Sequence, residues 1–238
     1  MTNIAVVLAG GSGTRMGLGR PKQFLEMAGK TILEHSVEAF HQNELIECII
    51  IVSNPDFIHE VEAIVAHHRA EEKWNKVRTV IPGGKERSDS SVNAIKEASS
   101  WEDGGDAINL IFHDAVRPLV DQRIITDVCQ ALEDHTAVNV TLPVVDTIIT
   151  TSEGTMTGTV DRSTLQRVQT PQGFRLSTIA EAYRRALADP EFRATDDCGV
   201  VLRYLPEVPI ALVRGSEHNL KLTYRDDMPL FEFLFEHR

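Results

Sequence analysis

A glycine-rich turn followed by two cations is the first feature of this 238-residue sequence whose residue types suggest chemistry. The turn follows the apolar run Ile4 to Leu8, and Arg15 and Lys22 come shortly after it. It consists of Ala9, Gly10, Gly11, Ser12 and Gly13. Glycines let backbone N–H groups converge on a phosphate as an anion-binding nest. We expect a phosphate site here. A plain turn with a solvated Lys22 is the structural alternative, because the motif is neither a Walker A loop nor a clean GxGxxG.

A carboxylate follows another apolar run, Ile108 to Phe112. It is Asp114 in the segment HDAVRP, which also contains Ala115 and Arg117. Parallel α/β sheets bind ligands at the carboxyl ends of their strands, so Asp114 is a candidate ligand-binding residue. A helix cap, or a turn carboxylate paired with Arg117, is the alternative.

A Gly-Gly turn follows the run Val77 to Ile81 and leads through Gly84 to Ser90. We expect a helix from Ser91 to Ala98 after it. The free amides of a helix N-terminus suit an anion or the edge of a base. Ser90 as a simple cap is the alternative.

Lys221 stands between two leucines in the segment Asn219 to Thr223, which we expect to be a strand. A lysine flanked by apolar residues extends its ammonium group to solvent or pairs it with an anion. We expect a phosphate partner for Lys221.

The elements that must position these residues alternate along the chain. Short β-rich runs without period-2 alternation indicate strands that are buried on both faces, and helical spacing separates them. The runs are Ile4 to Leu8, Cys48 to Ser53, Val77 to Ile81, Ile108 to Phe112 and Val138 to Leu142. This alternation predicts an α/β fold with a mostly parallel sheet and helices on both faces.

The segment from Val144 to Val168 departs from this alternation. Two β-branched runs flank Ser152, Glu153 and Gly154, which predicts a hairpin. A lone hairpin is marginal in water, so this arm should pack on the main domain or on a second subunit. No linker or repeat divides residues 1–238, which we expect to form one domain.

Charge and composition exclude several classes of protein. The net charge of −11 argues against nucleic-acid binding, since no basic stripe is present. No apolar run approaches the ~18 to 20 residues that span a bilayer, and Met1 to Leu8 lacks the basic start of a signal peptide.

The three scattered cysteines suggest neither disulfides nor zinc, and His67 and His68 are interpreted as solvated helix surface. We expect a cytoplasmic protein.

Several motifs occur in an ordered series along essentially the whole chain: LAGGSGTRMG with PKQF, HDAVRP, VQTPQGF and NLKLT. In this order they resemble the cytidylyltransferases that activate polyol phosphates, notably the 2-C-methyl-D-erythritol 4-phosphate and ribitol-5-phosphate cytidylyltransferases. The resemblance implies a Rossmann-like nucleotidyltransferase fold, with CTP and a small polyol phosphate as substrates. It also implies a homodimer built by a protruding β-arm at about residues 144–168.

The resemblance also implies functional residues, position by position. The implied catalytic residues, which stabilise the reacting phosphates, are Arg15, Lys22 and Lys221. The implied nucleotide-binding residues are Ala9, Gly10, Gly11, Gly13, Gly84, Ser90, Asp114 and Ala115. The implied acceptor-binding residues are Asp114, Arg117, Thr147, Arg162, Thr170 and Thr195, with Arg162 reaching into the neighbouring subunit's site. Metal ligands stay unassigned.

The chemistry of such a transfer agrees with these residues. The acceptor phosphate is mostly dianionic at neutral pH, because its second pKa is about 6, and it needs no general base to attack the α-phosphorus of CTP. Preorganised cations then stabilise the charge of the transition state and of the leaving pyrophosphate. One Mg²⁺ bridging triphosphate oxygens would relieve the repulsion between the two anions.

The acceptor remains open between two polyol phosphates. Val116 and Cys198 resemble the ribitol branch, whereas TVDRSTLQRVQTPQGF resembles the methylerythritol branch. We place methylerythritol phosphate first and ribitol phosphate second.

Two other classes of protein compete with this interpretation. A dinucleotide-dependent oxidoreductase would need an acidic residue at the end of the second strand, where Ser53, Asn54 and Pro55 stand instead. A non-catalytic nucleotide-binding regulator would have no need for Arg15, Lys22 and Lys221 together.

Overall fold

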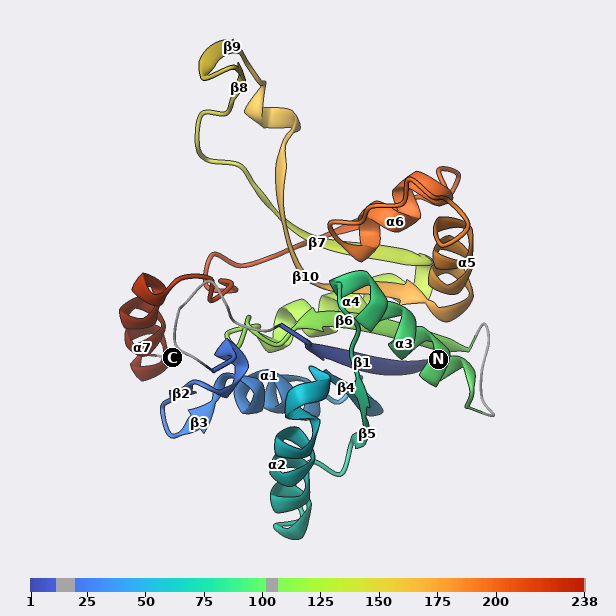
Figure 1. Cartoon of the computed structure of the whole chain (residues 1–238), viewed down its shortest axis with the longest axis vertical. Helices are drawn as coiled ribbons and strands as arrows, with labels where there is room; N and C mark the ends of the chain where they lie inside the picture. Colours follow the sequence, from blue (N-terminus) through green and yellow to red (C-terminus); the bar gives the residue numbers. More distant parts are fainter. Residues whose placement is uncertain (12–19, 102–106, 238) are drawn as a thin grey trace.

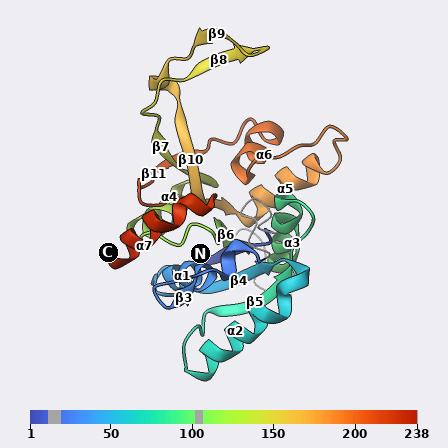
Figure 2. The same ribbon diagram turned by 60° about the vertical axis from the view of Figure 1, so that its left-hand side comes forward.

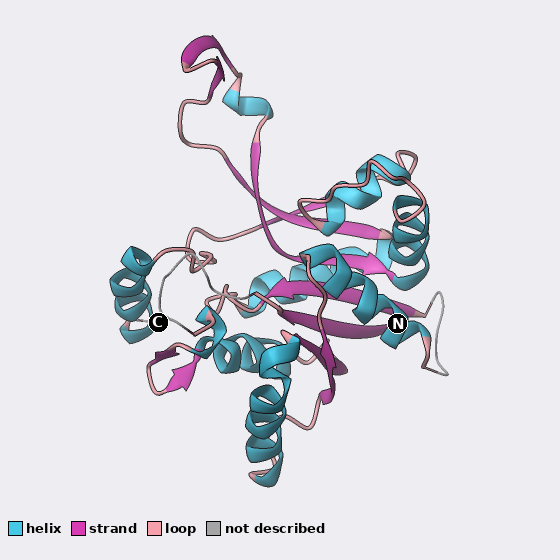
Figure 3. Ribbon diagram, viewed as in Figure 1, coloured by secondary structure: helices cyan, strands magenta, loops and turns pink. Residues whose placement is uncertain are grey.

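The computed structural model describes residues 1–11, 20–101 and 107–237, and its centre is a seven-stranded sheet (Figures 1 and 3). The strand order is β11-β7-β10-β6-β1-β4-β5. The strands are β1 Thr2–Ala9, β4 Cys48–Ser53, β5 Val77–Pro82, β6 Ile108–Asp114, β7 Ala137–Pro143, β10 Gln166–Arg175 and β11 Ala211–Arg214. Strand β10 is antiparallel to β6 and β7, while the other neighbouring pairs are parallel. The prediction of a mostly parallel sheet is confirmed.

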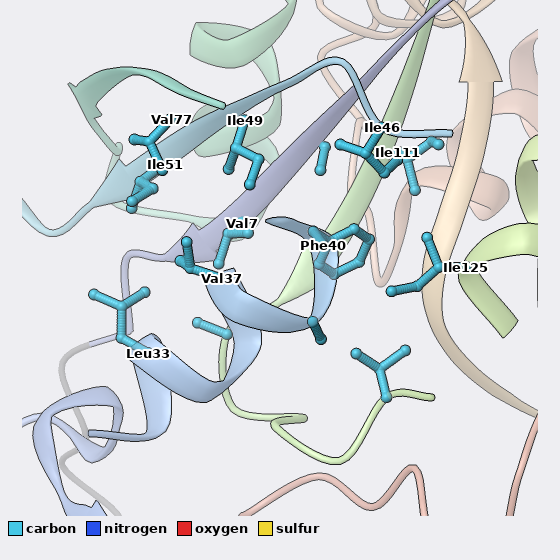
Figure 4. Close-up of a cluster of buried hydrophobic side chains, with 14 of the residues drawn as sticks. Val7, Leu33, Val37, Phe40, Ile46, Ile49, Ile51, Val77, Ile111 and Ile125 are labelled. Carbon is cyan, nitrogen blue, oxygen red and sulfur yellow. The ribbon is translucent and has the colours of Figure 1, made fainter. Parts of the chain in front are cut away.

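Helices cover both faces of the sheet, so its inner strands are buried on both sides, whereas the edge strands β5 and β11 are partly exposed. Along β1, Ala5 and Val7 face one core cluster, while Ile4 and Val6 face the other. The first cluster takes side chains from α1 Ile32–His41 and α4 Gln122–Asp134 (Figure 4), and also from α2 Ile58–Ala70. The second takes them from α3 Arg87–Ser99, α5 Leu176–Ala186 and α6 Asp197–Tyr204. Burial on both faces explains why the apolar runs lack alternation.

A third, smaller core cluster anchors the C-terminal segment. Phe231 of α7 Met228–Glu236 packs with Met27, Ile32, Leu119 and Leu222. The remaining short elements are β2 Glu26–Met27, β3 Lys30–Thr31, η2 Lys22–Phe24, η3 Pro55–Phe57, η4 Arg162–Thr164 and η5 Arg225–Asp227. The predicted strand around Lys221 was wrong, because residues 219–223 form a loop that burial of Leu222 holds in place.

A β-arm leaves the carboxyl edge of the sheet between β7 and β10 (Figures 1 and 2). Its tip is the hairpin of β8 Ile149–Ser152 and β9 Thr155–Thr159, with Glu153 and Gly154 at positive φ in the turn. The register between β10 and β7 shifts between Gln169 and Gln172, where the arm joins the body. The predicted hairpin is present, with strands shorter than the β-branched runs.

Two local predictions were wrong. Helix α3 begins at Arg87 rather than Ser91, because Glu86 precedes it as N-cap and donates its N–H to Asp89 at 3.0 Å. Ser90 therefore lies inside the helix and does not cap it. His68 is buried rather than solvated, since its Nε2 lies 2.7 Å from Glu34 and its ring stacks on Trp74.

The described helices include none that combines the length and apolar character needed to cross a lipid bilayer.

Candidate active site

A cavity of about 710 Å³ opens at the carboxyl edge of the sheet, beyond β1, β4, β5 and β6. Its walls include Ala9, Gly10, Gly11, Lys22, Asn54, Gly83, Gly84, Arg87, Ser90, Asp114 and Lys221. The loops that follow Leu8, Ile81 and Phe112 thus meet at one place, as the sequence predicted. Ligands of open α/β sheets bind at this edge.

The described part of the glycine-rich turn is held by a buried amide. Gln23 is 2% exposed, and its Nε2 donates to the carbonyl oxygens of Ala9 at 2.7 Å and Gly11 at 3.0 Å. Gly13 and Arg15 lie outside the described residues. The sequence analysis missed Gln23, although its place directly after Lys22 in the PKQF segment was the available signal.

The second glycine turn is packed too closely for any side chain. A Cβ on Gly84 would lie 2.1 Å from the Cβ of Asp89, and one on Gly83 would lie 2.7 Å from the Ser90 hydroxyl oxygen. The Gly84 N–H donates to that oxygen at 3.2 Å. Ser90 thus fixes the backbone that enters helix α3 at the cavity wall.

Lys22 extends its ammonium group to the loop that carries Lys221. Its Nζ donates to the carbonyl oxygens of Thr223 at 2.6 Å and Leu222 at 3.3 Å. Two cations far apart in the sequence therefore share one side of the cavity. A triphosphate could replace these neutral carbonyl groups as the partner of Lys22.

Asp114 stands between two cations at the end of β6. Lys221 Nζ lies 2.8 Å from Asp114 Oδ2, and Arg87 Nε lies 3.2 Å from Oδ1. Burial alone would raise the pKa of Asp114, but the charges of Arg87 and Lys221 outweigh burial and hold it far below its usual range. Neither alternative given for Asp114, a helix cap or a pair with Arg117, is found.

Arg87 links Asp114 to a second buried carboxylate. Its Nη1 lies 2.7 Å from Oδ2 of Asp197, which is fully buried at the start of α6. The Tyr183 hydroxyl donates to the other oxygen of Asp197 at 2.7 Å. Burial opposes the charged guanidinium, but the two carboxylates raise the pKa of Arg87 above its usual value. The sequence analysis missed this residue, because its partner Asp197 is distant in the sequence.

Two further predicted site residues lie beside Asp114, but they are not among the described residues that line the cavity. Ala115 is buried, and its N–H donates to the Leu8 carbonyl at 3.0 Å, which joins β6 to β1. Thr170 is 5% exposed, and its hydroxyl oxygen lies 3.1 Å from the Asp114 N–H. Arg117 Nη1 donates to the Asn219 carbonyl at 2.9 Å, and Arg117 is not among the described residues that line the cavity.

The other predicted acceptor residues lie apart from the cavity. Thr147 and Arg162 are exposed on the arm, where Arg162 Nη1 donates to the Val145 carbonyl at 2.7 Å. The arm projects away from the body of the same chain (Figure 2). Thr195 is exposed just before Asp196, the N-cap of α6. Within the described residues, the structure therefore brings most of the predicted nucleotide residues together at the cavity, and the acceptor residues only in part.

The sequence model of the family described as 2-C-methyl-D-erythritol 4-phosphate cytidylyltransferase matches residues 3–237. A protein of that description from Thermobifida fusca is 44% identical over 235 residues, covering 97% of this chain and 92% of the relative.

Two further matches widen the comparison. A bifunctional ribulose 5-phosphate reductase/CDP-ribitol pyrophosphorylase from Haemophilus influenzae is 41% identical, and the match covers 99% of this chain and 48% of that protein. The crystal structure of 4-diphosphocytidyl-2C-methyl-D-erythritol synthase from Anaerococcus prevotii superimposes with a TM-score of 0.82 at 24% identity, covering 100% and 96% of the two chains. The latter likeness concerns the fold.

A mostly parallel sheet covered on both faces, with two lysines at a cavity on its carboxyl edge, fits the family match, which makes the protein a nucleotidyltransferase. The substrate nucleotide of its relatives is CTP, so the expected cytidylyltransferase activity is confirmed. The chain belongs to the 2-C-methyl-D-erythritol 4-phosphate cytidylyltransferase family.

Proposed function

We propose that the protein transfers the cytidylyl group of CTP to the phosphate of 2-C-methyl-D-erythritol 4-phosphate and releases pyrophosphate. The observation that carries this proposal is the convergence of Lys22, Lys221 and the glycine turns on one cavity. The family match and the relative from Thermobifida fusca support the choice of acceptor.

The reaction is an in-line displacement. An oxygen of the acceptor phosphate forms a bond to the α-phosphorus of CTP, and the bond between that phosphorus and the bridging oxygen to the β-phosphate breaks. Lys22, with Arg15, would hold the triphosphate and the leaving pyrophosphate. Lys221 would stabilise the charge that grows at the α-phosphate. The base would lie against Gly84 and Ser90.

Mg²⁺ enters this scheme as the magnesium complex of CTP. The described residues contain no cluster of three or more acidic, histidine or cysteine side chains that could hold an ion. The Asp114 carboxylate is already engaged by two cations. Triphosphate oxygens and water would therefore supply most of the coordination, as Mg²⁺ commonly accepts.

The acceptor half of the site would be completed by a second copy of the chain. Large apolar side chains are exposed along the arm, with Val145 at 63% and Met156 at 56%. Exposed apolar patches mark interaction surfaces. A two-fold homodimer of single-domain cytoplasmic subunits would bring Arg162 and Thr147 to the partner's cavity.

Ribitol 5-phosphate is a second candidate acceptor, and one observation favours it. Val116, which resembles the ribitol branch, lines the cavity, and the relative from Haemophilus influenzae is 41% identical. Cys198, the other such residue, is buried with its sulfur toward the Val138 carbonyl and is not among the described lining residues.

The deciding experiment measures pyrophosphate release from CTP and Mg²⁺ with each polyol phosphate. We expect methylerythritol phosphate to give the larger kcat/KM, and CTP to exceed UTP and ATP with either acceptor. Faster pyrophosphate release with ribitol phosphate would overturn the choice of methylerythritol phosphate as the acceptor. Release with neither acceptor would overturn the proposed function.

A further inference from the structure

A closed ring of hydrogen bonds lies behind the cavity wall. The Asp114 N–H donates to the Thr170 hydroxyl oxygen, which lies 3.1 Å from His113 Nδ1. His113 Nε2 lies 3.1 Å from the Arg117 carbonyl oxygen. Arg117 Nη1 donates to the Asn219 carbonyl at 2.9 Å, and Asn219 Nδ2 donates to the Thr170 carbonyl at 2.8 Å. The ring joins β6, β10 and the loop that carries Lys221.

The partners fix where each proton of His113 and Thr170 lies. A carbonyl oxygen only accepts, so His113 Nε2 must carry a hydrogen. The imidazole is fully buried, which favours its neutral form, so Nδ1 is an acceptor. The Thr170 hydroxyl therefore donates to Nδ1 while it accepts from the Asp114 N–H.

This assignment limits what Thr170 can offer to a phosphate group, while a lone pair of its oxygen remains able to accept from a hydroxyl group. A phosphate dianion only accepts hydrogen bonds. The one proton of the Thr170 hydroxyl is already directed to His113. Thr170 could serve the acceptor phosphate only by giving up that bond and leaving a buried imidazole nitrogen without a donor, which is costly.

The same ring holds the loop from which Lys221 extends. Asn219 stands two residues before Lys221, and the N–H of Leu222 donates to the Val116 carbonyl at 2.9 Å. Together these bonds hold the backbone on both sides of Lys221 against the HDAVRP segment. They set the loop that places the ammonium group 2.8 Å from Asp114 Oδ2.

We propose that His113 is a positioning residue for the cytidylyl transfer, which keeps Asp114 and Lys221 in place through the Thr170 hydroxyl and the Asn219 loop. The inference rests on the proposed function of the cavity. It deepens that function by giving Thr170 and Arg117 a supporting role behind Asp114 and Lys221. A misplacement of about 1 Å at a reacting group can cost roughly 10²-fold in rate, so such a support affects turnover.

The first test is independent of activity. In protein labelled with ¹⁵N-histidine, NMR at pH 7 should find His113 neutral with its hydrogen on Nε2. The assignment should be made by comparison with His113→Gln. An Nδ1–H tautomer or an imidazolium at this pH would overturn the proposal.

The second test uses a matched pair of substitutions. His113→Gln can keep the donor to the Arg117 carbonyl but loses the acceptor for Thr170, and His113→Asn does the reverse. We expect His113→Gln and Thr170→Val each to lower kcat by about 10-fold to 100-fold, with acceptor KM changed less than about twofold. Thr170→Ser should restore kcat. The double variant should lose no more than the worse single one, because both act through one bond.

The controls separate this inference from the proposed function. His59→Gln, at an exposed histidine of α2, should leave kcat unchanged, and circular dichroism should confirm that each variant is folded. A raised acceptor KM in Thr170→Val with unchanged kcat in His113→Gln would overturn the positioning role. A wild-type protein that releases no pyrophosphate with either acceptor would instead overturn the proposed function, while the NMR test would still decide the tautomer.

Discussion

The cavity wall and the β-arm are built in opposite ways. In the wall and directly behind it, charged groups are buried and paired, as Asp197 illustrates with no exposed surface and an ion pair to the lining residue Arg87. On the arm, apolar side chains such as Val145 and Met156 face solvent. The wall is thus preorganised within one chain, whereas the arm presents a surface suited to another molecule. On the proposed function, the contrast teaches that the nucleotide half of the site would form within a single subunit, whereas the acceptor half would need the arm of a partner.

The sharpest test of this contrast mixes two inactive chains. Arg162→Ala and Lys22→Ala homodimers should each lose nearly all activity, since each site lacks either the arm residue or the nucleotide residue. After subunit exchange, about a quarter of all sites would be intact, and pyrophosphate release should return. Arg167→Ala is the control, because Arg167 pairs with Glu217 of its own chain. If subunits exchange and no activity returns, Arg162 does not act across the dimer.

The buried pairs of the wall predict a large loss of stability. Asp197→Asn should lower the free energy of unfolding by about 3 to 5 kcal/mol, because Arg87 would lose its ion-pair partner in a buried place. Asp127→Asn, which breaks the half-exposed pair with Arg123 on α4, should cost less than about 1 kcal/mol. Urea unfolding measures both. Equal losses would contradict the view that the wall depends on buried charge pairs.

Lys22 should matter for turnover more than for folding. Lys22→Ala should lower kcat/KM for CTP by about 10²-fold, or about 2.7 kcal/mol in the transition state. Lys30→Ala provides the control, since Lys30 forms its ion pair with Glu38 of α1. Steady-state kinetics with thermal unfolding would separate the two effects. Wild-type turnover in folded Lys22→Ala protein would remove Lys22 from the mechanism.

The smallest expected effect is a pH dependence of stability. Burial lowers the pKa of His113 to about 4, although the hydrogen bond to the Arg117 carbonyl and the charge of Asp114 both oppose the lowering. Below pH 6.5, the ordinary pKa of histidine being about 6.5, His113 binds a proton in the unfolded chain but stays neutral in the folded chain. Stability is therefore lost as pH falls, by up to about 1.4 kcal/mol per pH unit, until about pH 4. Urea unfolding at pH 7 and pH 5 should show a shallower dependence in His113→Gln, and identical slopes would refute this account.

Part of the fold was predictable because burial on both faces leaves a simple signal. The apolar runs at β1, β4, β5, β6 and β7 are strands, as their residue types indicated. Strand β10 gave no such signal, although it lies inside the sheet. Its Gln172 is fully buried, and the amide is satisfied by Asn139, Asp196 and the N–H of Asp197. Hydrogen bonds over such sequence distances leave no periodic pattern to detect.

Site residues were predictable from the sequence where the residues that act together lie within one loop. The glycine turn with Lys22, and the Gly84 turn with Ser90, both face the cavity. The role of Arg87 was not predicted, because its ion pairs are with Asp114 and Asp197, which are distant in the sequence and lie close to it only in the fold. Lys221 was identified, but its leucine neighbours suggested a strand. Leu222 is apolar because it packs in the cluster under α7, rather than in a sheet.

The register shift in β10 gives the arm its direction. Gln169 pairs with Val140 and Gln172 with Asn139, so Thr170 and Pro171 have no partners on β7 between these two pairs. Bulges of this kind bend a strand and increase its twist. The direction in which the arm leaves the sheet therefore depends on backbone geometry inside the main domain. One residue inserted above the bulge would move Arg162 by about 3.3 Å, well beyond the roughly 1 Å that a reacting group tolerates. The position of Arg162 would thus change through substitutions or insertions at the bulge, which lie in neither the cavity nor the tip of the arm.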